Sequence, residues 1–202
     1  SFITLPTSLT TIGGAAFQHC SALTAITLPP NVNSIGSDAF YKCTNLATVY
    51  VEMTSRPTMG NSVFDGISAT KTLYIKDGTG TTGTNYTQFA AADQWKDFTT
   101  KTPYWPLTVG SVGYASLYLG YAATIPTGIT AYTGTVNETS NYVALTQITD
   151  GIIPAETGVV LSGTANDYNF MPASTAGSAS KGSLSGTLTD LTPASGTNYY
   201  VL

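Results

Sequence analysis

Apolar and polar positions in the first half of the chain repeat with a fixed period. Residues 3–25 read ITLPTSLTTIGGAAFQHCSALTA and residues 26–48 read ITLPPNVNSIGSDAFYKCTNLAT, and the two align without a gap. The coinciding positions are Ile3 and Ile26, Leu5 and Leu28, Pro6 and Pro29, Ile12 and Ile35, Gly13 and Gly36, Ala16 and Ala39, Phe17 and Phe40, Cys20 and Cys43, and Leu23 and Leu46. A fixed period of this length predicts a stack of similar supersecondary units.

A degenerate third unit follows the two clear ones. The segment 49–51 takes the strand position, and Met59 and Phe64 match Ile35 and Phe40 at a spacing one residue longer than the period. The segment 73–75 then predicts a fourth strand, at the same longer spacing from 49–51. We expect the extra residue to lie in the loop at 53–57.

Stacking places equivalent residues of successive units in ladders, about one strand spacing (roughly 4.8 Å) apart. We expect the Ile, Leu, Phe and Cys positions to point inward. The middle residue of each strand triplet must then point outward, because side chains alternate along a strand. The predicted outward ladder consists of Thr4, Thr27, Tyr50 and Tyr74.

A short helix is predicted over 85–92, with Asn85 as a plausible N-cap and Tyr86, Phe89 and Ala90 at helical spacing. This helix, completed by Trp95 and Phe98, is expected to close the end of the stack, because an open end exposes core and strand edges. The first domain is therefore predicted to span 1–102.

The period stops at 102–106, where two prolines favour an extended linker. Short alternating runs between turn clusters then predict a second, β-sandwich-like domain over 107–202. The predicted strands are 115–119, 129–135, 143–148, 158–161, 168–171, 182–188 and 198–202. The fold class is thus mainly β with a little α: a short repeat solenoid followed by a β-sandwich-like domain.

The repeats resemble the BspA-like leucine-rich repeats of bacterial surface proteins, in which I-x-L-P, I-G-x-x-A-F and C-x-x-L recur at this period. The resemblance covers residues 1 to about 100. The segments 113–118 and 153–161 resemble a β-domain that often follows such repeats in surface proteins of gut bacteria. The resemblance implies an exported protein that acts in adhesion or ligand capture. We also expect the chain to be part of a longer protein, with the β-domain lacking a final hairpin.

Charge excludes some partners. Only 9% of the residues are charged, with seven Lys and Arg against eleven Asp and Glu and a net charge of −4. Nucleic-acid binding requires several cations, and none cluster here. A basic membrane-binding patch is missing for the same reason. The sequence also contains no apolar run of about 18 residues, the length that would predict a membrane-spanning segment.

Two motifs carry chemistry in other folds. The segment 78–83 spells G-x-G-x-x-G, but a dinucleotide site needs a βαβ unit, so a surface loop is the favoured interpretation. The segment 178–181 spells S-x-x-K within a Ser/Gly-rich stretch that lacks the partner motifs of lactamases. We interpret both motifs as loops.

Other reactive residues do not combine into a site. Cys20 and Cys43 are expected to be stacked, buried thiols, with a disulfide as the alternative. His19 is the only histidine, its counterpart in the next repeat is Lys42, and it is expected on the surface. We therefore predict no catalytic residues, no metal site and no cofactor, although scattered carboxylates leave a glycosidase pair open.

The candidate ligand-contact surface comprises Tyr50, Tyr74, Glu52, Arg56 and Lys76, which are close in the repeat register. Tyr and Arg are enriched at binding hot spots. The alternative is that these tyrosines only stabilise cross-strand pairs. The same alternative applies to the tyrosines of the second domain, which are Tyr114, Tyr118, Tyr121 and Tyr132.

These observations favour a non-catalytic protein of the extracellular space or cell surface, which binds a host or bacterial surface protein or a glycan. The alternative function is a carbohydrate-binding module in the β-domain. That alternative predicts a shallow groove in 107–202, lined by exposed tyrosines and polar groups.

Overall fold

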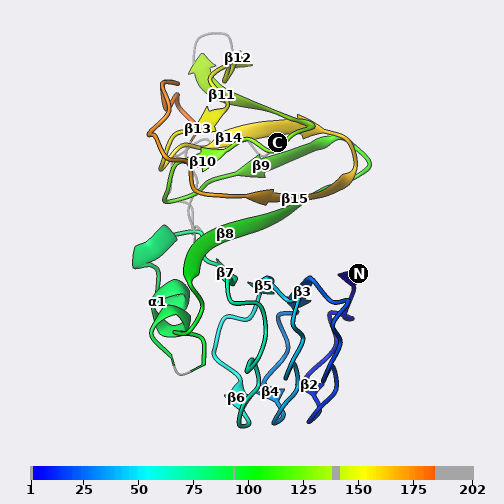
Figure 1. The fold of residues 1–202 in the computed structure, drawn as a ribbon. Coiled ribbons are helices and arrows are strands. Elements are labelled where there is room, and N and C mark those ends of the chain that lie inside the picture. Colours follow the sequence, from blue (N-terminus) through cyan, green and yellow to red (C-terminus); the bar gives the residue numbers. More distant parts are fainter. Residues whose placement is uncertain (1, 93, 138–141, 185–202) are drawn as a thin grey trace, which may run out of the picture. The chain divides into compact units, whose positions relative to one another are not determined.

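The computed structural model describes residues 2–92, 94–137 and 142–184, which form two compact units (Figure 1). The first unit comprises the residues up to Asp77 together with Thr81–Pro103. The second comprises Gly78–Gly80 together with the residues from Tyr104 onward. The described residues are mostly β with one α-helix, as the sequence predicts.

Four parallel strands carry the sequence period in the first unit (Figure 1). They are β1 (Phe2–Ile3), β3 (Ala25–Leu28), β5 (Thr48–Val51) and β7 (Thr72–Lys76). Ile26 pairs with Val49, and Val49 pairs with Leu73, so the second step along the chain is one residue longer than the first. The structure therefore confirms both the register of the repeat and the single inserted residue.

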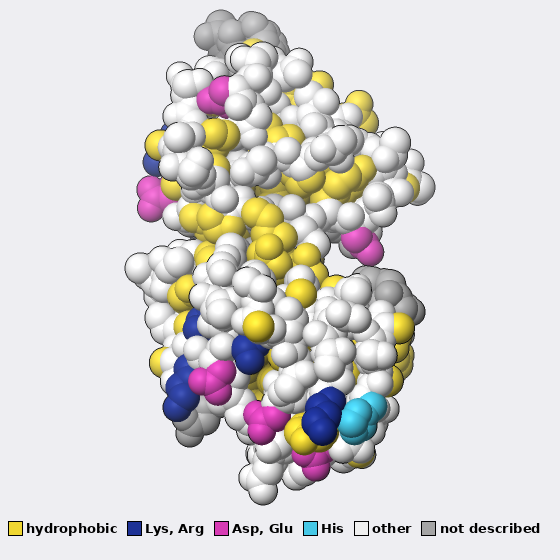
Figure 2. Space-filling model, in the orientation of Figure 1, with side chains coloured by type: hydrophobic (Ala, Val, Ile, Leu, Met, Phe, Trp, Pro, Cys, Tyr) yellow, Lys and Arg dark blue, Asp and Glu magenta, His cyan; other side chains and the backbone are white. Residues whose placement is uncertain are grey.

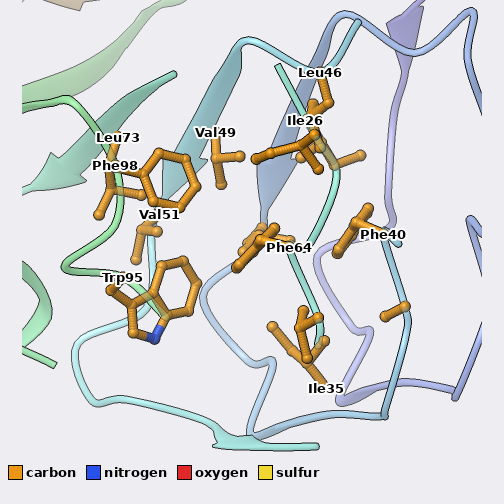
Figure 3. Packing of buried hydrophobic residues seen from close by; sticks show 14 of the residues in the cluster. Ile26, Ile35, Phe40, Leu46, Val49, Val51, Phe64, Leu73, Trp95 and Phe98 are labelled. Carbon is orange, nitrogen blue, oxygen red and sulfur yellow. The ribbon is translucent and has the colours of Figure 1, made fainter. Parts of the chain in front are cut away.

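A second parallel ladder consists of β2 (Thr11–Ile12), β4 (Ser34–Ile35) and β6 (Thr58–Met59). Between the two ladders lies the core that Figure 3 shows, where Ile26, Ile35 and Leu46 are almost fully buried. Inward-facing and outward-facing side chains alternate along β5, where Val49 and Val51 are buried while Thr48 and Tyr50 are half-exposed.

Each repeat turns through two residues with left-handed backbones. The first of these is Ala15, Asp38 or Ser62, and the second is His19, Lys42 or Gly66, so both positions recur with the repeat. Between them the backbone N–H of Phe17 donates to the carbonyl of Ala39, and that of Phe40 donates to the carbonyl of Val63. The phenylalanines stack, with ring centroids 5.2 Å apart for Phe17 and Phe40 and 5.5 Å for Phe40 and Phe64.

The C-terminal end of the stack is covered by α1 (Thr84–Ala90) and the turn that follows it. Trp95 and Phe98 are 1% and 2% exposed and contact the Phe64 ring, with centroids 5.1 Å and 5.4 Å away. Phe89, on α1, contacts Trp95 from the other side. The predicted plug of Trp95 and Phe98 is confirmed.

The N-terminal cap of α1 differs from the prediction. Gly83, not Asn85, is the N-cap residue, and as a glycine it has no side chain that could cap the helix. The carboxylate of Asp77 accepts instead from the N–H of Tyr86, at 2.8 Å. The Asn85 amide donates to the carbonyls of Met53 and Lys76, so Asn85 attaches the helix to the last repeat.

The second unit contains a four-stranded antiparallel sheet in the order β12-β11-β14-β9. These strands are β9 (Tyr114–Leu117), β11 (Ile129–Asn137), β12 (Tyr142–Gln147) and β14 (Val159–Gly163). A short pair forms between β10 (Ala123–Thr124) and β13 (Ile152–Ile153). Leu161, Phe170 and Ala131 lie in the core of this unit.

One long strand replaces the linker predicted at 102–106. β8 runs over Thr100–Val109, and its second half pairs antiparallel with β15 (Asn166–Phe170). The linker prediction was wrong because an extended backbone with proline φ also suits a strand, wherever the missing N–H is not needed by the ladder. Residues 182–184 form no strand, and the rest of the strand predicted at 182–188 and that at 198–202 lie outside the described residues.

Candidate functional site

Two tyrosines stack on the outward face of the parallel sheet. Thr27 pairs with Tyr50, and Tyr50 pairs with Tyr74, so the three side chains lie in register. The rings of Tyr50 and Tyr74 are nearly parallel, with centroids 4.8 Å apart and an interplanar angle of 14°. The predicted outward ladder is therefore present from Thr27 to Tyr74, while Thr4 is exposed but lies just beyond β1. Register alone brings the rings together because parallel strands align equivalent residues.

The position of Tyr50 in this ladder changes its acidity. Burial raises the pKa of Tyr50 above its usual value, and the neighbouring Tyr74 raises it further. A tyrosine is neutral at ordinary pH and the shift keeps Tyr50 so to higher pH, where its hydroxyl can still donate and accept a hydrogen bond. The face is suited to apolar and hydrogen-bonding contacts rather than to proton transfer.

The charged residues of the predicted surface are only partly brought together. The pairing of Val51 with Ile75 puts the next residues, Glu52 and Lys76, beside each other at the ends of their strands. Both side chains are half-buried and make interactions of their own. Arg56 is exposed in the loop between β5 and β6 and does not belong to the ladder.

The glycine-rich segment 78–83 follows β7 and precedes α1, as a phosphate loop would. However, the Asp77 carboxylate already occupies the start of the helix, and a Cβ at Gly83 would collide with that carboxylate. β7 is also the last strand of the repeat ladder rather than part of a βαβ unit. Gly83 thus makes room for an internal carboxylate, which would repel a phosphate.

The two cysteines differ in burial. Cys43 is fully buried, and its thiol donates to the carbonyl of Phe17 at 2.9 Å. Burial raises the pKa of the Cys43 thiol. Cys20 is only half-buried, contrary to prediction, because among the described residues only the repeat of Cys43 packs against its repeat. Both are free thiols in the structure.

His19 is exposed, and its ring lies edge-on to Tyr41 with centroids 5.9 Å apart. This position on a repeat turn agrees with the prediction of a surface residue. Within residues 2–92, 94–137 and 142–184, no three His, Cys, Asp or Glu side chains are grouped to hold a metal ion.

The second unit holds a polar hollow that the sequence did not reveal. It measures about 450 Å³, and its lining includes Thr133, Thr146, Thr149, Asp150 and Ser180. No aromatic residue is among the described residues that line it, whereas a tyrosine-lined groove was predicted for a carbohydrate site here. The hollow could not be found from sequence because its walls, around 133–135, 146–150 and 178–182, are far apart along the chain.

The S-x-x-K segment forms one wall of this hollow. The N–H and the hydroxyl of Ser178 both donate to one oxygen of Asp150, each at 2.6 Å. These bonds, followed by that from the N–H of Ile152, lower the pKa of Asp150 below its usual value. Lys181 lies 3.4 Å from Glu156, so both motif residues have structural partners.

The tyrosines of the second unit do not form one surface. Tyr114 is 63% exposed on β9, while Tyr132 lies half-buried on β11. The Tyr121 hydroxyl donates to the carbonyl of Phe170, and its ring packs against the core. These observations leave the stacked pair Tyr50–Tyr74 and the polar hollow as the candidate sites.

Charged side chains are sparse on the face that Figure 2 shows, where they stand singly or in small mixed groups. Among the described residues, no helix is long and apolar enough to cross a bilayer. The surface is therefore dominated by uncharged polar and apolar groups, as the 9% content of charged residues requires.

Comparison with known families agrees with the repeat register. Residues 1–101 match the family model described as BspA type leucine rich repeat region (6 copies). No curated protein and no solved structure matches the chain. The match covers half of the 202 residues and coincides with the stacked strands of the first unit. The chain therefore belongs to the BspA-type leucine-rich-repeat family.

Proposed function

We propose that this protein is a non-catalytic, exported cell-surface protein that binds a protein or glycan of a host or bacterial surface. Proteins with BspA-type repeats are commonly surface or adhesion proteins, which supports the proposal. The ligand contact is assigned to the sheet face around Tyr50 and Tyr74.

The observation that carries this assignment is the stacked tyrosine pair. Each ring is held by a strand that is paired in register with its neighbour, so the rings are fixed before a ligand arrives. A preorganised contact loses less side-chain entropy on binding. Tyrosine also offers a large contact area together with a hydroxyl, which is why it is enriched at hot spots.

The neighbouring groups add specificity. Thr27 continues the outward ladder beside Tyr50 and supplies a further hydroxyl. Glu52 and Lys76, of opposite charge, flank the tyrosines at the strand ends. Charges at the rim of a contact act mainly on orientation and on-rate rather than on affinity.

Screening of the intact protein on glycan and surface-protein arrays tests this function. With any ligand found, Tyr50→Ala and Tyr74→Ala should each weaken binding by about tenfold or more, which corresponds to a hot-spot contact. Tyr41→Ala is the matched control, since Tyr41 lies on a repeat turn away from the sheet face. Tyr50→Phe and Tyr74→Phe separate the contribution of the ring from that of the hydroxyl.

The proposal fails if the Tyr50 and Tyr74 variants bind as tightly as the unmodified protein while retaining its circular dichroism spectrum. Export is tested separately by antibody labelling of intact cells of the source organism, in which staining equal to background would contradict a surface location.

A second candidate function is carbohydrate binding by the second unit. The polar hollow favours it, although the predicted tyrosine lining is not found among the described residues.

A further inference from the structure

We propose that the polar hollow of the second unit is a binding site for an uncharged polyhydroxylated ligand, namely a neutral saccharide. This inference rests on the second candidate function and gives it a place and a ligand class. It is independent of the tyrosine pair, because the hollow lies in a different unit.

The hollow is built on one face of the β11–β12 hairpin. Thr133 pairs directly with Thr146, so their side chains project from the same face of the sheet. Thr135, two residues along β11, projects from that face as well. The opposite wall is the segment 178–182, whose end is attached to β11 because the Ser183 N–H donates to the Gly134 carbonyl at 2.6 Å.

Asp150, an exposed residue of the lining, connects two walls of the hollow. One carboxylate oxygen accepts both bonds from Ser178, and the other accepts from the N–H of Ile152 at 3.0 Å. Asp150 therefore ties the end of the hairpin to the opposite wall through one side chain. A site held in this way keeps its shape in the absence of ligand, which limits the entropy lost on binding.

Size and lining charge restrict the ligand. A volume of about 450 Å³ falls within the roughly 300–1,000 Å³ of small-molecule sites. Among the described residues, Asp150 is the only charged one in the lining, and no Lys or Arg lines it. An anionic ligand would face an uncompensated carboxylate. An apolar ligand would leave the hydroxyls of the lining without partners, which costs free energy.

Hydroxyls dominate the remaining lining. Thr146, Thr149 and Ser180 are exposed toward solvent, and Thr133 and Thr135 lie on the same hairpin face. A threonine or serine hydroxyl both donates and accepts hydrogen bonds, as does each hydroxyl of a sugar. A neutral saccharide thus satisfies the described lining at many positions.

The test is titration of the intact, isotope-labelled protein with glucose, galactose, N-acetylglucosamine and mannose, followed by amide chemical-shift mapping. Glucuronate and glucosamine serve as anionic and cationic counterparts of glucose. We expect shifts confined to 133–135, 146–150 and 178–182 with at least one neutral sugar, and none with glucuronate.

Variants then test the hydroxyl contacts. Thr146→Val and Thr149→Val keep the branched shape and should each weaken binding by about two- to tenfold, the effect of one net hydrogen bond. Thr146→Ser should restore binding. Thr130→Val is the matched control, because Thr130 is on β11 but does not line the hollow.

Three results would overturn the proposal: no shifts in the hollow with any of the four neutral sugars, binding that survives both Val variants, or binding of glucosamine alone. The last would indicate recognition of a cation by Asp150. Shifts centred on Tyr50 and Tyr74 would instead place sugar binding on the repeat surface, which supports the first function and removes this one.

Discussion

Gly36 and Gly60 occupy the point in each repeat where the backbone of the preceding repeat comes closest. A Cβ at Gly36 would collide with the backbone of Gly14, and a Cβ at Gly60 would collide with that of Ser37. The equivalent Gly13 has open space at the same position. The glycine of the repeat pattern is therefore required by packing between neighbours rather than by its own conformation.

This difference predicts unequal effects of the same substitution. Gly36→Ala should lower the free energy of unfolding by about 1–3 kcal/mol, because backbone must shift to admit the methyl group. Gly13→Ala should change it by less than about 0.5 kcal/mol. Urea unfolding followed by circular dichroism measures both values. Equal losses in the two variants would show that the collision at Gly36 is not the cause.

Tyr50 provides a prediction about pH. Burial, and after it the neighbouring Tyr74, raises the pKa of Tyr50 in the folded protein. Tyr50 therefore loses its proton at a lower pH in the unfolded chain than in the folded one. The stabilising contribution is complete below the ordinary tyrosine pKa of 10.0 and is lost as pH rises through the folded value. The free energy of unfolding should therefore fall above about pH 10.

The matched variant is Tyr50→Phe, which keeps the stacked ring without an ionisable group. Its free energy of unfolding should decline less with rising alkaline pH than that of the unmodified protein, as measured by urea titrations at several pH values. An unchanged slope would assign the alkaline decline to other residues.

At the scale of elements, Gln94 attaches the segment after α1 to the turn of the last repeat. Its side-chain carbonyl accepts from the N–H of Val63 at 2.9 Å, and its amide donates to the carbonyl of Gly60 at 2.8 Å. In the first repeat the equivalent N–H, that of Ala16, donates to the equivalent carbonyl, that of Gly13, so the Gln94 amide bridges two groups that pair with each other there. The residue has a left-handed backbone with φ of 65°, and no repeat motif marks it.

Gln94→Asn retains the amide and suits the left-handed backbone, but the side chain is too short to reach both partners. We expect a loss of about 1–3 kcal/mol in the free energy of unfolding, because the N–H of buried Val63 loses its acceptor. Gln18→Asn, at an exposed turn position, is the control and should have little effect. Thermal unfolding that is equal in the two variants would contradict a stabilising role of the Gln94 bridge.

An element could be predicted from the sequence where the residues that determine it lie within the element itself. The strands β3, β5 and β7 could be placed from sequence because the same apolar pattern recurs at each of them. The cap of α1 by Asp77 could not, since that carboxylate acts from outside the helix, before the loop that leads into it. β8 was missed because its prolines suit a linker and a strand equally well.

The candidate sites follow the same rule. Tyr50 and Tyr74 were recognised because a fixed period and strand alternation together determine their direction. The hollow depends on contacts such as that of Asp150 with Ser178, which are distant in sequence and carry no periodic signal. Sequence patterns of this kind predict surfaces on repeats better than they predict cavities in irregular β-units.

At the scale of the whole molecule, low charge governs the choice of partner. Seven cations and eleven acids are spread over 202 residues, for a net charge of −4. Phosphate-rich polymers bind through several neutralised contacts and release counterions, and this chain lacks the cations to provide them. Its partners are therefore expected to be uncharged or mixed surfaces.

A heparin column tests this expectation. The intact protein should pass through at low ionic strength without retention, because its sequence holds no basic cluster to retain a polyanion. Retention that is reversed by added salt would contradict it and would point to a basic patch formed by several chains together.

The fluorescence of Trp95 can report whether the helical cap of the first unit is in place. It is 1% exposed, surrounded by Phe64, Phe89 and Phe98, and it is one of only two tryptophans in the chain. In a Trp105→Phe variant, the intrinsic tryptophan fluorescence would arise from this indole alone. A red shift of its emission that precedes the loss of the β-sheet circular dichroism signal would then report that the helical cap opens before the repeat strands separate.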